Sequence, residues 1–142
     1  MKRIFFPWGI ILVILSVALM SYAKWEKIAI SKGNLAELKG EWIGSRTIGP
    51  GRDFNTDLEI LNDTLPVQSK FILYDVTRPG RQRGETVITD FKNGKINDQG
   101  NLLITGNNIE VELSLFEDDG KKKLEGNYFW KGNKGTMSFK KK

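Results

Sequence analysis

The chain has 142 residues and a formal net charge of +5, and it contains neither Cys nor His. Without Cys it forms no disulfide and no thiolate site, and without His it lacks the commonest general base and transition-metal ligand near neutral pH. Ser-His-Asp, Cys-His and His-based zinc chemistry are therefore excluded, although carboxylate, lysine and calcium chemistry stay open. We predict a protein that is not an enzyme, with no catalytic residue, metal site or cofactor.

The basic residues are mixed with acidic residues along the chain rather than gathered in one stripe. A nucleic-acid-binding domain normally concentrates its positive charge on one face. Lys2 and Arg3 also precede an apolar segment, so they do not add to the charge of the domain that follows. We therefore predict no nucleic-acid partner.

Residues 1–23 have the pattern of a membrane-directed segment. Met1-Lys2-Arg3 is a short positive head, and the uncharged run 4–23 that follows it is predicted to form a hydrophobic helix. Each apolar side chain that leaves water gains ~1.5–3 kcal/mol, so the membrane is the expected partner of residues 4–23, at least during export. The rest of the chain is expected to be extracytoplasmic, either exported to the periplasm or anchored to the cell membrane.

Two fates of this segment stay open. Ser21-Tyr22-Ala23 matches the small-x-small cleavage site of a signal peptide, which would leave a mature chain that starts at Lys24. Alternatively, an uncleaved anchor of ~20 residues would cross the hydrocarbon core, with Trp8 and Trp25 near its two ends as interfacial aromatic residues.

The predicted organisation after the segment is a linker over residues 24–39 and a β domain over residues 40–142. The linker has one expected helical turn over residues 35–38, with Asn34 as its cap. After residue 40, turn sequences rich in Gly, Asn, Asp and Pro recur at intervals of ~8–12 residues, which is typical of antiparallel sandwiches and barrels. Asn93-Gly94 is the strongest hairpin signal, because both residues tolerate the positive φ of a type I′ turn.

Period-two alternation of apolar and polar residues predicts about eight strands between these turns. It is clearest over residues 109–115, and it also predicts the core-facing residues of the other strands: Trp42, Gly44, Arg46, Leu58, Ile60, Phe71, Leu73, Val87, Phe91, Leu102, Ile104, Leu124, Tyr128, Trp130, Met137 and Phe139. We predict an all-β, antiparallel up-and-down β-barrel, and an open β-sandwich is the alternative. Gly44 and Gly126 are expected at the tight bends that closure needs.

Two stretches carry a family resemblance. Residues 38–44 (LKGEWIG) place a Gly-x-Trp motif after a short helical turn, and residues 124–130 (LEGNYFW) with 135–139 (GTMSF) form a closing hairpin. These features resemble calycin-type barrels, the group of lipocalins, avidins and fatty-acid-binding proteins. The resemblance implies that Gly40 and Trp42 close one barrel end.

The sequence also departs from that pattern. Lipocalins usually pack an Arg from a late strand against the motif Trp, and this chain has no Arg after Arg83. The C-terminal helix of the family is absent, and the polar and Trp residues that hold biotin in avidins have no clear counterparts.

Three groups of residues are candidates for binding. Trp42, Tyr128 and Trp130 are expected to face inward, where they either line a pocket for an apolar ligand or fill a small barrel. Arg78, Arg81 and Arg83 lie in an expected hairpin loop that either grips an anion or is a solvated turn. The lysines at 121–123 and 140–142 either attract anionic lipid or polysaccharide, or guard strand edges and aid solubility.

Acidic residues give weaker signals. Glu117-Asp118-Asp119-Gly120 lacks the spaced ligands of a calcium loop and is ordinary turn chemistry. Glu110 and Glu112 are expected ~7 Å apart on one strand face, a spacing that a glycosidase pair could use, but exposed alternation on an amphipathic strand explains them without any chemistry.

The expected function is therefore that of a non-enzymatic, extracytoplasmic binding module for a small apolar ligand or a component of the cell envelope. The alternative is a structural or interaction protein of the envelope, which would use loops or a sheet edge as its working surface.

Overall fold

The computed structural model describes residues 24–75 and 84–142, and for Asp75 and residues 84–92 it describes the backbone alone. The prediction of a membrane helix in residues 1–23 lies outside these residues. Nine strands form one sheet: β1 (Glu26–Ile28), β2 (Gly40–Thr47), β3 (Asp53–Ile60), β4 (Val67–Asp75), β5 (Gly84–Ile96), β6 (Leu102–Gly106), β7 (Ile109–Asp118), β8 (Lys121–Trp130) and β9 (Asn133–Lys141). A 3₁₀ turn, η1 (Lys32–Asn34), leads into a short helix, α1 (Leu35–Leu38).

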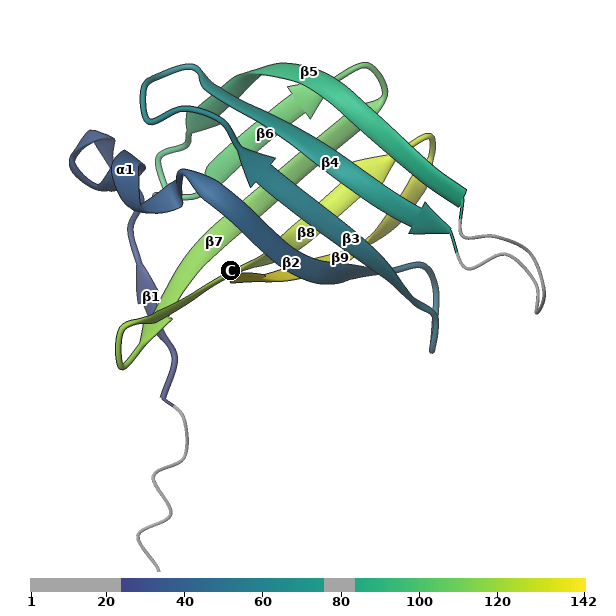
Figure 1. Ribbon diagram of the computed structural model, residues 1–142, viewed down its shortest axis with the longest axis horizontal. Helices are drawn as coiled ribbons and strands as arrows, with labels where there is room; N and C mark the ends of the chain where they lie inside the picture. Colours follow the sequence, from purple (N-terminus) through teal and green to yellow (C-terminus); the bar gives the residue numbers. More distant parts are fainter. Residues whose placement is uncertain (1–23, 76–83) are drawn as a thin grey trace, which may run out of the picture.

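The strands from β2 to β9 close into an eight-stranded antiparallel barrel (Figure 1). Each pairs with the next along the chain, and β9 returns to pair with β2, with Trp42 opposite Lys141. The predicted up-and-down barrel is thus confirmed. The open sandwich is wrong because the β2–β9 pairing leaves neither of these strands as a free edge.

The predicted inward faces form the core. Alternation along the strands buries one residue in two, and the rings of Phe71 and Phe139 meet inside the barrel with centroids 6.3 Å apart. Of the predicted inward side chains, those of Val87 and Phe91 lie outside the described part. The buried apolar residues of the strands are Trp42, Leu58, Ile60, Val67, Phe71, Leu73, Leu102, Ile104, Ile109, Val111, Leu113, Leu115, Leu124, Tyr128, Met137 and Phe139.

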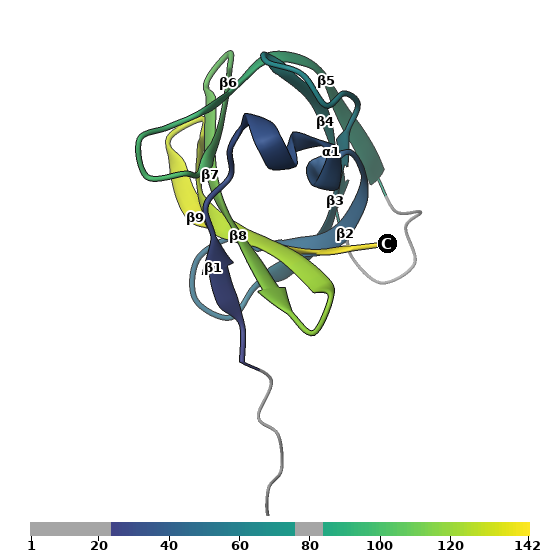
Figure 2. The same ribbon diagram turned by 90° about the vertical axis from the view of Figure 1, so that its left-hand side faces the viewer.

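The helix α1 covers one end of the barrel, which we call the capped end (Figure 2). Its Leu35 and Leu38 are buried, and the indole Nε1 of Trp42 donates a 2.8 Å hydrogen bond to the Leu38 carbonyl oxygen. The predicted cap was wrong in detail: the Asn34 side chain makes no capping bond to α1 and instead accepts from the Ser31 backbone N–H at 2.8 Å.

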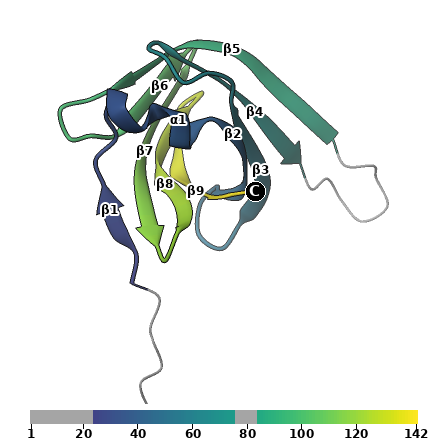
Figure 3. The same ribbon diagram turned by 60° about the vertical axis from the view of Figure 1, so that its left-hand side comes forward.

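A short strand that the sequence does not predict, β1, lies in the expected linker (Figure 3). It pairs with β7 from Ile28 opposite Leu115 to Glu26 opposite Glu117, whereas the β6–β7 pairing ends with Leu102 opposite Leu113. The strand therefore occupies the edge of β7 that β6 leaves open. Three residues are too few to show a period-two pattern, which explains the miss.

The hairpin predicted at Asn93-Gly94 is also wrong. Both residues lie within β5, and Gly94 pairs with Val67 across a stretch where the β4–β5 register shifts. A Cβ atom at Gly94 would lie 2.7 Å from the Val67 carbonyl oxygen. Here glycine allows two backbones to approach closely at an irregularity in the sheet. In the sequence, a glycine needed for this reason cannot be told from a glycine in a turn.

Candidate functional site

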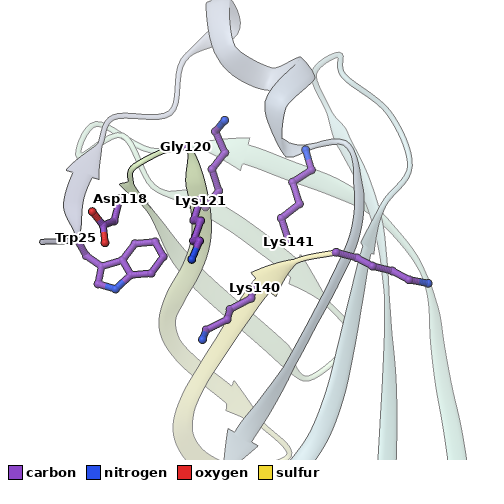
Figure 4. A pocket seen from close by; sticks show the side chains of 8 residues that line it. Trp25, Asp118, Gly120, Lys121, Lys140 and Lys141 are labelled. Carbon is purple, nitrogen blue, oxygen red and sulfur yellow. The ribbon is translucent and has the colours of Figure 1, made fainter. Parts of the chain in front are cut away.

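The two lysine-rich stretches meet at the capped end. They are the start of β8 and the end of β9, and because these strands are antiparallel the stretches lie side by side, with Lys123 opposite Lys140. They line a cavity of about 590 Å³ that we call the lysine groove (Figure 4). Its lining residues are Trp25, Asp118, Gly120, Lys121, Lys122, Lys140, Lys141 and Lys142.

The inward-facing lysine of β9 belongs to the closure of the barrel. The Lys141 ammonium lies 5.6 Å from the centroid of the Trp42 ring and donates to the Glu37 carbonyl oxygen in α1. Burial, and then the nearby charge of Lys122, lower the pKa of Lys141, while Glu37 raises it. Lys122 also interacts with α1, since its Nζ lies 4.0 Å from Glu37 Oε2.

Two other lysines at this end have partners. Lys123 Nζ lies 4.6 Å from the ring centroid of Trp25 and 3.0 Å from Glu125 Oε1, so it fixes the indole against the strand. Lys142 Nζ lies 2.7 Å from Glu41 Oε2, and this hydrogen bond raises the pKa of Lys142 and lowers that of Glu41.

Lys121 and Lys140 remain as exposed cations of the groove. Within residues 24–75 and 84–142, neither forms an ion pair or a cation–π contact. In Figure 4 they lie on one side of the groove, with Trp25 and Asp118 on the other. Two ammonium groups beside an indole can bind an anion that also has an apolar part, such as a phosphate or carboxylate on a lipid or polymer.

The three aromatic residues predicted for a ligand pocket do not come together. Trp42 lies at the capped end, fully buried beneath α1. Tyr128 and Trp130 lie towards the opposite end, where the Tyr128 hydroxyl donates 2.8 Å to the Thr47 carbonyl oxygen and Lys131 Nζ lies 5.1 Å from the Trp130 ring centroid. Core packing explains Trp42 and Tyr128, and Trp130 packs against the edge of the core.

A buried cation, Arg46, lies inside the barrel. It is 2% exposed, its Nη1 donates 3.0 Å to Thr56 Oγ1, and its guanidinium lies 5.2 Å from the centroid of the Phe54 ring. Burial raises the pKa of Tyr128, and the charge of Arg46 opposes this rise. Alternation predicted that Arg46 faces inward, like Trp42 and Gly44 on the same strand. Arg46 was not among the candidates for binding that the sequence suggested.

The predicted anion-binding loop, with Arg78, Arg81 and Arg83, lies outside the described residues. The flanking strands end at Asp75 and Gly84, at the end of the barrel opposite α1 (Figure 1). The loop therefore joins the barrel far from the lysine groove.

Comparisons of the chain with family models, curated proteins and solved structures find no match. No group of three or more acidic side chains in the described part is arranged to hold a metal ion. Nor is any helix of residues 24–75 and 84–142 long and apolar enough to cross a membrane. The geometry of the lysine groove and of the barrel interior is thus the basis for a functional proposal.

Proposed function

We propose that this protein is a non-enzymatic, extracytoplasmic binding module that holds an anionic component of the cell envelope in the lysine groove. The exposed pair Lys121 and Lys140, beside Trp25 in a cavity of about 590 Å³, carries the proposal. The extracytoplasmic location rests on the sequence of residues 1–23. The barrel acts as a scaffold that brings two distant lysine-rich stretches to one end.

The fold supports a calycin-type classification as part of this proposal. A short helix covers one end of an eight-stranded barrel, above the buried tryptophan of the Gly-x-Trp motif, as the resemblance implies. Lys141 also supplies a late-strand cation against Trp42, in the role for which the family usually has an Arg.

A charge-reversed pair tests the function directly. The full chain is reconstituted in bilayer discs of neutral lipid, and inorganic polyphosphate is the probe. Each hydrogen bond to a charged group contributes ~1.5–3 kcal/mol, so K121E/K140E is expected to weaken binding about a hundredfold. The control R52E/K134E makes the same charge change with exposed residues of the β2–β3 loop and β9, and it is expected to bind within about twofold of the wild type, since screening leaves little effect beyond ~10 Å.

A third variant separates the two candidate anion sites. R78Q/R81Q/R83Q neutralises the predicted loop and leaves the lysine groove intact. Wild-type binding by this variant supports the groove. Loss of binding in it, with K121E/K140E unaffected, assigns the anion to the loop and refutes the proposal.

A small acidic ligand inside the barrel is the second candidate, and the buried guanidinium of Arg46 favours it. Its apolar part would have to share the interior with side chains such as Phe71 and Phe139, which already meet there. Native mass spectrometry of the full chain purified from its own envelope tests this candidate. A retained acid that R46M abolishes would support it, and a mass equal to that of the bare chain would refute it.

The interaction-protein alternative keeps the barrel as a scaffold and makes a protein the partner. Cross-linking through Lys121 and Lys140 in intact cells distinguishes it. A defined protein adduct at these two positions, absent at Lys134, would favour this alternative over an anionic ligand.

A further inference from the structure

The lysine groove lies where the described chain begins. Trp25 lines the groove and directly precedes β1, which pairs with β7 next to the β7–β8 hairpin. Figures 1 and 3 show β1 and this hairpin side by side at the capped end. The described chain therefore begins beside the groove that Lys121 lines.

The preceding residues are those predicted to enter the membrane. If this run is retained as an anchor that ends at Ala23, Trp25 lies two residues from the lipid boundary. Two residues span at most ~7 Å, which is within the ~8–10 Å over which charges interact at physiological salt. An indole at this depth is also typical of membrane–water interfaces.

The outer face of the strands at this end is positively charged. Strand alternation puts Trp25, Phe116 and Lys123 on one face, and the Lys123 ammonium indeed lies over both rings, at 4.6 and 5.3 Å from their centroids. Along β1, β7, β8 and β9, the charged residues on this face at the capped end are the basic Lys27, Lys121, Lys123 and Lys140 and the acidic Asp118 and Glu125, and the adjacent Lys142 is paired with Glu41. The face thus presents an excess of cations towards the expected lipid boundary.

We propose that the lysine groove docks on the anionic phospholipid headgroups of the membrane that holds residues 4–23, so that the barrel is seated by its capped end. This inference rests on the proposed function, since it names the anionic component, and on retention of the N-terminal segment. Because a tether makes docking intramolecular, modest attraction suffices. Each lysine near an anionic surface favours the docked state roughly fivefold.

Lysine acylation, mapped by peptide mass spectrometry, tests the docking. The full chain is reconstituted in discs of phosphatidylcholine alone or mixed with phosphatidylglycerol. We expect acylation of Lys121, Lys140 and Lys27 to slow by about fivefold or more in the anionic discs at low salt, because Nζ atoms in contact with headgroups are shielded. Lys131 is exposed in the turn between β8 and β9, at the end of the barrel opposite the groove, and it serves as the internal reference in every variant. High salt is expected to remove the difference.

A variant checks that the groove itself is responsible. In K121Q/K140Q, Lys27 can still be labelled, and its slower acylation in anionic discs is expected to disappear. In R52E/K134E it is expected to persist. Equal Lys27 rates in the two lipid mixtures for the wild-type chain would overturn the docking inference.

Polyphosphate distinguishes failure of this inference from failure of the proposed function. If polyphosphate slows acylation of Lys121 and Lys140 in neutral discs but phosphatidylglycerol does not, the groove binds anions and the lipid assignment is wrong. If neither anion slows it, both proposals fail. A mature chain from the native envelope that starts at Lys24 would also overturn the docking, because it has no anchor.

Discussion

Glu112 illustrates how one carboxylate can hold a loop in place. Its Oε1 accepts hydrogen bonds from Asn101 Nδ2 at 2.8 Å and from Asn97 Nδ2 at 2.9 Å, and Ser114 Oγ donates 2.9 Å to Asn101 Oδ1. The bond from Asn101, followed by that from Asn97, lowers the pKa of Glu112. The residue considered as one member of a glycosidase pair thus has a structural use in the β5–β6 connection.

This network predicts how stability depends on pH. Because the pKa of Glu112 is lower in the folded state, its stabilisation is present above the ordinary Glu pKa of about 4.3 and is lost as the pH falls through the lowered folded-state value. E112Q is expected to unfold more readily than the wild type at neutral pH and to lose less stability on acidification. Urea unfolding across this pH range measures both effects.

Glu110→Gln is the matched control for this prediction, because Glu110 is exposed on the same strand. It is expected to keep the wild-type pH profile. An unchanged profile for E112Q as well would show that the hydrogen bonds around Glu112 do not contribute to stability.

Single residues show which features of the structure could be predicted from the sequence and which could not. The Gly-x-Trp motif located Trp42 correctly because an indole buried beneath the helical turn that precedes it is a local feature. The sequence has no Arg that could pack on Trp42 from a late strand, and in the structure Lys141 takes this place. What the position requires is a cation that can donate to an α1 carbonyl oxygen, and a motif defined by residue type does not express this requirement.

At the scale of elements, Gly126 allows β7 and β8 to approach closely. A Cβ atom there would lie 1.7 Å from the Glu112 carbonyl oxygen and 3.0 Å from Leu113 Cα. The structure thus gives the close approach of β7 as a reason for glycine here, and the bend expected at Gly126 stays a prediction. The nearest atoms belong to the backbone of the paired strand, so side-chain rotation cannot make room.

G126A is therefore expected to destabilise the barrel by about 3 kcal/mol, at the upper end of overpacking costs. The melting temperature should fall by roughly 10 °C. Gly33→Ala is the control, since a Cβ at Gly33 would meet only Ser31 Oγ at 3.6 Å, and its effect should stay within about 1 kcal/mol. Thermal unfolding followed by circular dichroism measures both, and equal melting temperatures would contradict the close-approach explanation.

The strands were more predictable than their interruptions. Long alternating segments such as β7 fixed their inward faces, because one side chain in two must leave water. The short strand β1 and the uninterrupted β5 were missed, since pairing with a distant strand and an irregular β4–β5 register decided them. Local sequence carries neither kind of information.

At the scale of the whole molecule, regular turn spacing predicted a closed meander, and the barrel confirms it. The lysine groove could not be predicted from turn spacing alone. Residues 121–123 and 140–142 were candidates in the sequence, but only the β8–β9 register brings Lys123 opposite Lys140, and only β1 brings Trp25 beside them. The same register turns Lys141 inward, towards Trp42, and leaves Lys121 and Lys140 exposed on the outer face. A run of lysines in the sequence does not show this difference.

Closure through β2 and β9 also has a kinetic consequence. Most strand pairs join neighbours along the chain and require only short loops, but Trp42 must find Lys141 across almost the whole domain. This non-local step is expected to limit the folding rate. Because β9 carries Lys140 to its place in the groove, the anion site is assembled only when the barrel closes. A chain arrested before this step presents two open strand edges and no completed groove, so occupancy of the site reports that folding is finished.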